Sequence, residues 1–67
     1  MSVYKIIEVV GTSAESWEKA AQEAIETTSK SLKDLRIAEV VKLDIQMDDG
    51  KVKAYRAKLK VSFKYHS

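Results

Sequence analysis

The chain holds few of the side chains that carry out covalent or acid–base catalysis. It has no cysteine, its one histidine is His66 near the end of the sequence, and its two glycines are Gly11 and Gly50. Neither a Cys–His nor a Ser–His–Asp arrangement can be built on a histidine at a frayed chain end. Two isolated glycines do not make a phosphate-binding loop. The sequence therefore predicts a protein that is not an enzyme.

Carboxylates are the second kind of side chain that could do chemistry. Asp48 and Asp49 are adjacent, but an Asp-Asp-Gly run is typical of a turn. If a calcium-binding loop began at Asp44, Asp49 would occupy its glycine position and Tyr55 its final glutamate, so that pattern fails. Calcium held by carboxylates of several subunits stays open as an alternative, with no ligand assigned.

The third chemical feature is a run of basic residues. The chain has 12 Lys and Arg against 10 Asp and Glu, a net charge of +2 that is too balanced to indicate nucleic-acid binding. Residues 51–64 contain no acid but several cations, namely Lys51, Lys53, Arg56, Lys58, Lys60 and Lys64. No outward aromatic side chains alternate with them as stacking platforms for single strands. We expect salt bridges at a subunit interface, with docking of an acidic macromolecule as the alternative.

The elements that position these side chains begin with a strand. Residues 3–10 are rich in β-branched residues, and both alternating faces of the segment are largely apolar. Such a strand needs cover on both sides, and a single helix covers only one. A chain of 67 residues without cysteine has neither a disulfide nor a zinc cluster to stabilise a small core. The sequence therefore predicts self-association.

An amphipathic helix follows this strand. Gly11 is predicted to end the strand, and either Thr12, in a capping box with Glu15, or Ser13 to cap the helix. Apolar or small residues then recur at helical spacing over about five turns. They are Trp17, Ala20, Ala21, Ala24, Ile25, Thr28, Leu32 and Leu35. The alanines keep this stripe thin, so helix and sheet can approach closely, and Trp17 is interpreted as a core anchor.

Two further strands, at roughly 36–47 and 52–65, form a hairpin. In the second strand apolar residues alternate with mostly basic ones, which is typical of an amphipathic strand. A three-residue loop over 48–50 would place Leu43 opposite Tyr55. A two-residue turn over 49–50 would place Leu43 opposite Arg56, so the sequence favours the longer loop.

The first strand of this hairpin changes face part-way along. Within residues 41–47 every second residue, starting at Val41, is apolar and defines the core face. Continued towards the N-terminus, the same alternation would place Glu39 on that core face. A β-bulge at Val40-Val41 repairs the pattern and places Ile37 and Glu39 on the outer face with Lys42, Asp44 and Gln46, beside Arg56, Lys58 and Lys60. Bulges are common next to binding sites. The outer face around Ile37, Lys42 and Arg56 is therefore the candidate site.

These elements predict one α+β domain over residues 1–67, with the element order β-α-β-β. The helical crossover makes the first two strands parallel, and the last strand lies between them in a three-stranded antiparallel sheet. The helix packs across one face and leaves the other for partner subunits. No segment approaches a membrane span or resembles a signal peptide, so we expect a cytoplasmic protein.

The order of these features resembles the dodecin family over essentially the whole chain. The similar segments are Val3-Tyr4-Lys5, Val10-Gly11-Thr12-Ser13, the alanine-rich helix, Ala38-Glu39-Val40-Val41 and Val61-Ser62-Phe63-Lys64. Dodecins form hollow spheres of twelve β-α-β-β subunits, and their best-known members sequester flavins or flavin precursors. The resemblance implies a hollow homododecamer that binds or stores a small ligand or ion without catalysis.

The resemblance also implies that the flavin site is altered in this chain. Flavin-binding dodecins have a stacking tryptophan where this chain has Ile37, a glutamine that bonds the ring where it has Arg56, and an acid where it has Lys42. Isoleucine offers no aromatic face, and arginine only donates hydrogen bonds, whereas an amide also accepts them. We expect no tight flavin binding and a closer similarity to the dodecin relatives described as calcium-binding. A structural or partner-binding module with a basic outer sheet face is the alternative function.

Overall fold

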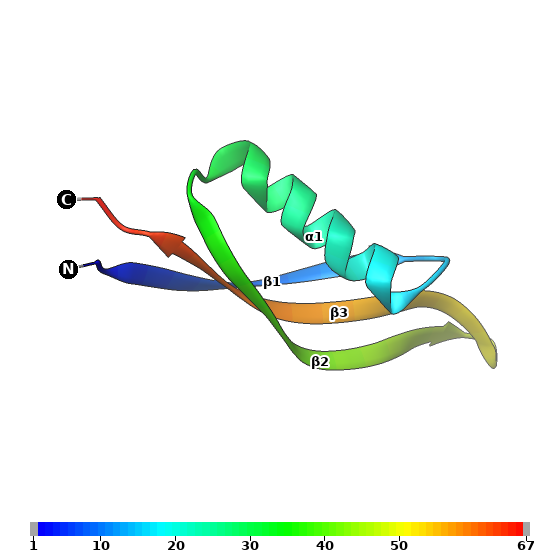
Figure 1. Cartoon of the computed structure of the whole chain (residues 1–67). Coiled ribbons are helices and arrows are strands. Elements are labelled where there is room, and N and C mark those ends of the chain that lie inside the picture. The colour runs from blue at the N-terminus through cyan, green and yellow to red at the C-terminus, as the bar shows by residue number, and fades with distance from the viewer. Residues whose placement is uncertain (1, 67) are drawn as a thin grey trace.

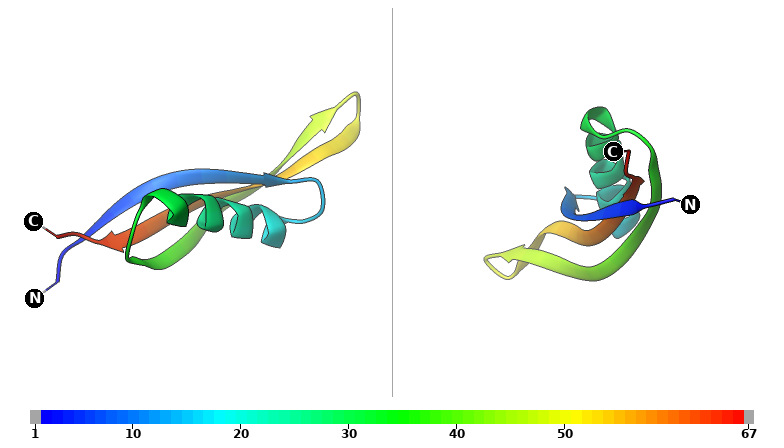
Figure 2. Two further views of the ribbon diagram at one scale, coloured as in Figure 1. Left: turned by 90° about the horizontal axis from the view of Figure 1, so that it is seen from above. Right: turned by 90° about the vertical axis from the view of Figure 1, so that its left-hand side faces the viewer.

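Four elements follow one another in the computed structural model, which describes residues 2–66 (Figure 1). Strand β1 spans Tyr4–Ser13, helix α1 Trp17–Ser31, strand β2 Leu35–Asp48 and strand β3 Lys51–Lys64. The strand order is β1-β3-β2, and β3 pairs antiparallel with both neighbours. The helix lies across one face of the sheet (Figure 1, Figure 2). The predicted β-α-β-β fold, with the last strand in the middle, is confirmed.

The predicted strand 3–10 runs on to Ser13, and the helix begins later than expected. Thr12 and Ser13, the predicted helix caps, belong to the ladder with β3. The helix cap is Ser16, whose Oγ accepts a hydrogen bond from the Lys19 amide at 3.0 Å. The capping prediction is wrong because pairing with β3 satisfies the backbone of residues 11–13, which an earlier cap would have left to water.

Gly11 lies at the contact between helix and sheet rather than at a strand break. It pairs with Ala57 of β3 inside the ladder. A methyl group added at Gly11 would overlap the Ala20 carbonyl oxygen and stand 2.8 Å from the Ala24 Cβ. The missing side chain therefore lets the helix backbone come down onto β1, as the alanine stripe predicted.

The buried core is small. Its members are Ala20, Ala24, Ala57, Leu59 and Val61, each no more than 6% exposed. Among the described residues, only Leu59 and Val61 are large side chains that are fully buried. Trp17, predicted to be a core anchor, is half-buried beside Tyr55, with the two rings edge to face and their centroids 5.2 Å apart. The single chain therefore buries less apolar surface than the helix pattern led us to expect.

Strands β2 and β3 join through a two-residue turn at Asp49-Gly50, so the predicted three-residue loop is wrong. Both turn residues have positive φ, 51° and 73°, the conformation of a type I′ hairpin. Asp48 and Lys51 pair across the turn. This backbone twist matches that of the strands, which favours the shorter turn.

A bulge close to the turn explains why apolar residues still face each other. The register shifts by one between Gln46 and Met47, so Lys53 has no partner on β2. Leu43 then pairs with Ala57 rather than with Tyr55 or Arg56. The predicted Leu43–Tyr55 pairing is wrong, because the shorter turn and the bulge each shift the register by one residue in the same direction. Together they move the partner of Leu43 two residues along β3, which keeps it on the same face.

Two further bulges set which residues of β2 face away from the helix. The predicted bulge is confirmed by a register shift between Val40 and Lys42, and a second shift lies between Leu35 and Ile37. We call the sheet face opposite α1 the outer face. By the register it carries Tyr4, Ile6, Glu8, Val10 and Thr12 of β1, Ile37, Glu39, Lys42, Asp44 and Gln46 of β2, and Arg56, Lys58, Lys60 and Ser62 of β3.

The far part of the β2–β3 hairpin extends beyond the helix as an arm (Figure 2). The molecule measures 50 × 20 × 15 Å, and its radius of gyration of 13.6 Å exceeds the ~11 Å of a compact chain of this length. The helix packs mainly on β1 and β3. Large apolar side chains of the hairpin are therefore exposed, namely Val40, Val41, Leu43, Ile45, Met47 and Val52. No helix among residues 2–66 is long and apolar enough to cross a membrane.

We expect Gly11→Ala to destabilise the protein strongly. The added methyl group overlaps backbone of α1, which cannot move without lifting the helix off β1. Overpacking of this kind costs about 1–3 kcal/mol or more in free energy of unfolding. Urea titration followed by circular dichroism measures the loss.

Gly50→Ala is the matched control. Nothing lies within 4 Å of a methyl group at Gly50, so only its positive φ of 73° opposes the substitution, at about 1–2 kcal/mol. A loss at Gly11 no greater than that at Gly50 would contradict the close helix–sheet contact.

Candidate functional site

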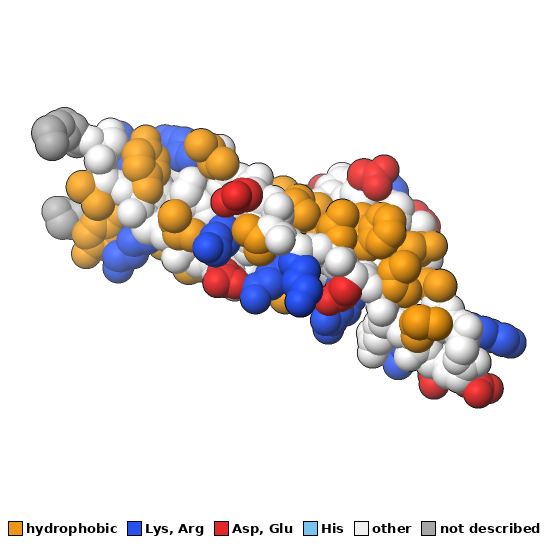
Figure 3. Space-filling view, turned by 90° about the horizontal axis from the view of Figure 1, so that it is seen from below, with side chains coloured by type: hydrophobic (Ala, Val, Ile, Leu, Met, Phe, Trp, Pro, Cys, Tyr) orange, Lys and Arg blue, Asp and Glu red, His pale blue; other side chains and the backbone are white. Residues whose placement is uncertain are grey.

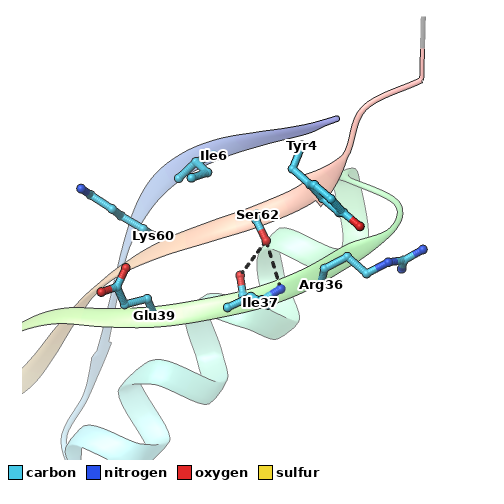
Figure 4. A pocket seen from close by; sticks show the side chains of 7 residues that line it. All are labelled: Tyr4, Ile6, Arg36, Ile37, Glu39, Lys60 and Ser62. Atoms are coloured by element: carbon cyan, nitrogen blue, oxygen red, sulfur yellow. Dashed lines mark hydrogen bonds between the residues drawn. The ribbon is translucent and has the colours of Figure 1, made fainter. Parts of the chain in front are cut away.

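A hollow of about 600 Å³ lies on the outer face, near the end of β3 (Figure 4). It spans all three strands, because its walls are Tyr4 and Ile6 of β1, Arg36, Ile37 and Glu39 of β2, and Lys60 and Ser62 of β3. Ile6 and Ile37 are 64% and 69% exposed, so their apolar surface is available to a ligand. The hollow can therefore receive the apolar body of a small molecule.

The floor of the hollow is fixed by a side chain to backbone contact. Ser62 Oγ accepts a hydrogen bond from the Ile37 amide at 3.2 Å and donates one to the Ile37 carbonyl at 3.4 Å (Figure 4). This pair bridges β2 and β3 beside the bulge at Arg36. The Ser62 hydroxyl is thereby engaged within the protein, and the floor is largely apolar.

Charged side chains stand at both ends of the hollow. In Figure 4, Lys60 and Glu39 lie at one end, and Arg36 lies at the other end with the Tyr4 hydroxyl. The bulge is the reason that Arg36 takes part, because strict alternation would put neighbours 36 and 37 on opposite faces. The hollow thus has an apolar middle with polar groups at either end.

The predicted site residue Arg56 lies elsewhere on the outer face and is already paired. Its guanidinium donates hydrogen bonds to both carboxylate oxygens of Asp44, at 2.7 and 2.8 Å. This bonding lowers the pKa of Asp44 below its ordinary value. From the helix side, Trp17 Nε1 donates to the Asp44 carbonyl oxygen at 3.0 Å. Asp44 is therefore held on both sides, and it in turn holds Arg56.

The predicted site residue Lys42 stands directly opposite Lys58 across the strands. Lys58 has its own partner, Glu8, at 3.1 Å. Basic side chains gather in the middle of the outer face, with apolar side chains to either side (Figure 3). Carboxylates on the neighbouring strands thus neutralise part of the positive charge of the basic run.

The structure separates the three predicted site residues. Ile37 lines the hollow, whereas Lys42 and Arg56 do not. Ile37 pairs with Ser62, six residues along β3 from Arg56, which corresponds to about 20 Å. All three share the outer face as predicted, but a small molecule in the hollow of a single chain reaches only Ile37.

Tyr4, Ile6, Arg36 and Ser62 were missed as site residues. The alternation of residues 3–10 does place Tyr4 and Ile6 on one face, so the signal for these two was present. Arg36 carried no such signal, because its position depends on a bulge that the pattern does not require.

His66, interpreted as a frayed terminal residue, has a partner in the structure. Its Nε2 lies 2.9 Å from Asp34 Oδ2, and this hydrogen bond lowers the pKa of Asp34. The Asp34 carbonyl also accepts a hydrogen bond from the Lys64 amide at 3.0 Å. Asp34, with φ of 63°, therefore joins the start of β2 to the end of β3.

Within residues 2–66, no three acidic or histidine side chains come close enough together to hold a metal ion. Asp44 and Asp34 are engaged with Arg56 and His66.

Comparison with known proteins identifies similar chains over nearly the full length. The family model described as Dodecin matches residues 3–66. A calcium dodecin from Mycobacterium tuberculosis is 48% identical over 64 residues, covering 96% of this chain and 90% of its own length. A dodecin from Thermus thermophilus is 39% identical over 62 residues, covering 92% and 90%.

Solved structures agree with this result. Dodecin from Streptomyces coelicolor superimposes with a TM-score of 0.93 at 32% identity, covering 98% of this chain and 94% of that one. A structure of calcium dodecin from M. tuberculosis, described as a calcium-chelating immunodominant antigen with a novel calcium-binding site, gives 0.87 at 48% identity, covering 97% and 93%.

We expect acid to weaken the fold through Asp44. Its pKa is lowered in the folded protein, so its ion pair stabilises fully above the ordinary value of 3.8 and is lost as the pH falls through the lower folded value. Asp44→Asn removes this component, so its urea midpoint should fall less between neutral pH and about pH 2 than that of the unmodified chain.

Asp48→Asn is the control for this pH series, since Asp48 takes part in none of the ion pairs found within residues 2–66. Equal pH slopes for Asp44→Asn and the unmodified chain would show that the Asp44–Arg56 pair does not contribute in solution.

Proposed function

The chain belongs to the dodecin family, and from this we propose that it is a single-domain, non-catalytic subunit of a homo-oligomeric shell that binds or stores a small ligand or ion in the cytoplasm. The observation that carries the proposal is the hollow on the outer face. It is walled by Ile37, the position that matches the flavin-stacking tryptophan of the family, and it offers apolar surface bounded by polar groups.

Assembly into a shell is supported by the surface that one chain leaves uncovered. The arm exposes a continuous group of apolar side chains on β2, including Leu43, Ile45 and Met47, which a partner subunit would bury. The core of only two large, fully buried side chains among the described residues is too small to make the chain very stable alone. We propose a closed particle of roughly twelve chains, consistent with the symmetric closure that most oligomers adopt.

Flavin is not the ligand that this hollow favours. Ile37 gives no aromatic face, and Arg56 is engaged by Asp44 at hydrogen-bond distance. Because Arg56 lies about 20 Å from Ile37 in one chain, a ring in the hollow would meet an Arg56 only from a neighbouring subunit. It would have to break the pair of that arginine with Asp44 or leave its own polar edge without the partner that an amide supplies. The protein would therefore bind riboflavin weakly.

Calcium is the ion that the comparisons favour. The calcium dodecin of M. tuberculosis is 48% identical to this chain. Calcium takes six to eight oxygen ligands, and within residues 2–66 no three carboxylate or histidine side chains of one chain come together, so we place its site between subunits. We assign no ligand to it.

A partner-binding role for the basic outer face is the second candidate. Lys42, Lys58 and Lys60 are its central cations. The ion pairs of Lys58 and Arg56 reduce the charge that an acidic partner would meet. This role is weaker than ligand binding for that reason.

A thermal-shift panel of flavins, nucleotides, coenzyme A and calcium tests the proposed function. A ligand of the native state stabilises by RT ln(1 + [L]/Kd), about 2.7 kcal/mol at a hundredfold excess over Kd. Stabilisation by at least one member supports a binding or storage role. No shift with any member, with the fold intact, would contradict it for these ligand classes.

We expect riboflavin fluorescence to be quenched only weakly by the unmodified chain and more strongly by Ile37→Trp combined with Arg56→Gln. A restored stack contributes about 1 kcal/mol, and a restored amide contact a similar amount, which together amount to about thirtyfold in Kd. Titration of the purified proteins measures the change.

Lys53→Trp combined with Arg56→Gln is the matched control, because Lys53 lies outside the hollow at the bulge near the turn. Strong quenching by the unmodified chain would overturn the loss of the flavin site. Equal gains in the two double variants would show that the family positions are misaligned here.

A further inference from the structure

We propose that the ligand of the hollow is a small amphipathic anion, an apolar or aromatic body with one carboxylate or phosphate group, and that Arg36 binds this group. The inference rests on the proposed function, since it assigns a ligand class and an orientation to the same hollow. It is carried by the contrast between Arg36 and the other arginine of the outer face.

The two arginines differ in how far their donors are used. Arg56 makes two short hydrogen bonds to the carboxylate of Asp44. Among residues 2–66, Arg36 makes a single ion-pair contact, in which Nη1 lies 3.9 Å from Asp34 Oδ1. This distance is too long for a hydrogen bond. The side chain of Arg36 is 46% exposed. Its guanidinium therefore keeps donors free for a planar anion, which a fork of parallel N–H groups can bind in a bidentate manner.

Asp34 offsets this charge only in part, because its nearer oxygen lies 3.9 Å from Arg36 Nη1 and its other oxygen is occupied. Asp34 Oδ2 lies 2.9 Å from His66 Nε2, and this contact is the main cause of the lowered pKa of Asp34. Asp34 is not among the residues that wall the hollow, whereas Arg36 is. Arg36 thus brings to the wall of the hollow a positive charge that Asp34 offsets only in part.

The opposite end of the hollow gives the ligand its orientation. Lys60 and Glu39 are cross-strand partners there, one donor and one acceptor of opposite charge, so this end is close to neutral. The Arg36 end has a cation and the Tyr4 hydroxyl but no carboxylate among the residues of the wall. An anionic group is therefore favoured at Arg36, with the body lying over Ile6 and Ile37 (Figure 4).

The size of the ligand follows from the strand spacing. Lys60 bounds one end, and Tyr4 at the other end pairs with Lys64, four residues further along β3. Four residues span about 13–14 Å. A bicyclic ring system with one acidic group fits this length, whereas a dinucleotide lying along the strands exceeds it.

A pair of probes that differ only in charge tests the proposal. 2-Naphthoate carries the carboxylate, and 2-naphthalenemethanol has the same rings with a neutral group in its place. We measure binding to the intact protein from the fluorescence anisotropy of the naphthalene. The unmodified chain should bind the naphthoate about tenfold or more tightly than the alcohol, since a hydrogen bond to a charged group contributes about that much.

Arg36→Met keeps the aliphatic stem and removes the guanidinium. It should lower naphthoate affinity to that of the alcohol and leave alcohol binding unchanged. Lys53→Met removes one positive charge outside the hollow and should preserve the preference. A preference for naphthoate that persists in Arg36→Met, or its absence from the unmodified chain, would overturn the assignment of Arg36.

Failure of the hollow itself gives a different result. If neither probe binds to the unmodified chain, or if Ile37→Asp leaves alcohol binding intact, the hollow is not the ligand site and the inference falls with it. If the alcohol binds and is lost in Ile37→Asp but naphthoate is not preferred, the hollow stands as a binding site and only the anionic ligand is rejected.

Discussion

The close contact between helix α1 and strand β1 determines how the rest of the molecule is arranged. Gly11 has no side chain under the helix, and Ala20 and Ala24 have only methyl groups above the sheet. Small residues on both sides bring the two layers together, but they also limit the apolar volume that lies between them. The helix is fixed over β1 and β3, so the arm of β2 and β3 has no cover from its own chain. An exposed apolar surface is therefore a direct consequence of the same contact that brings the helix and the sheet together.

The fold could be predicted from the sequence because its strongest patterns are long. The alternation along β3 and the alanine-rich helix stripe depend on many residues, so single errors do not change the outcome. The helix cap at Thr12 was wrong because a capping box is a local signal, whereas the ladder with β3 is formed by residues more than forty positions away. The turn prediction was wrong because the two-residue turn and the bulge close to Gly50 each shift the pairing of β2 and β3 by one residue. Together they keep apolar residues opposite apolar residues, and the sequence pattern shows only this combined result.

The candidate site could be predicted in part. The bulge at Val41 correctly placed Ile37 and Arg56 on one face, since parity determines the face of a strand residue. Parity does not give the distance along the strand, and these two residues lie about 20 Å apart in one chain. Arg36 escaped prediction because a bulge, rather than alternation, places it in the wall of the hollow. The chain thus has the dodecin fold, and its outer face holds one arginine engaged by Asp44 and another, with a single ion-pair contact to Asp34, beside an apolar floor.

The central claim is that this chain completes its structure only with copies of itself. Light scattering coupled to gel filtration, at micromolar protein concentration, measures the mass of the particle directly. The account predicts a single species of roughly twelve chains of 7.6 kDa each, unchanged on moderate dilution. A folded monomer or a simple dimer at that concentration would contradict it, because the apolar arm would then be stable in contact with water.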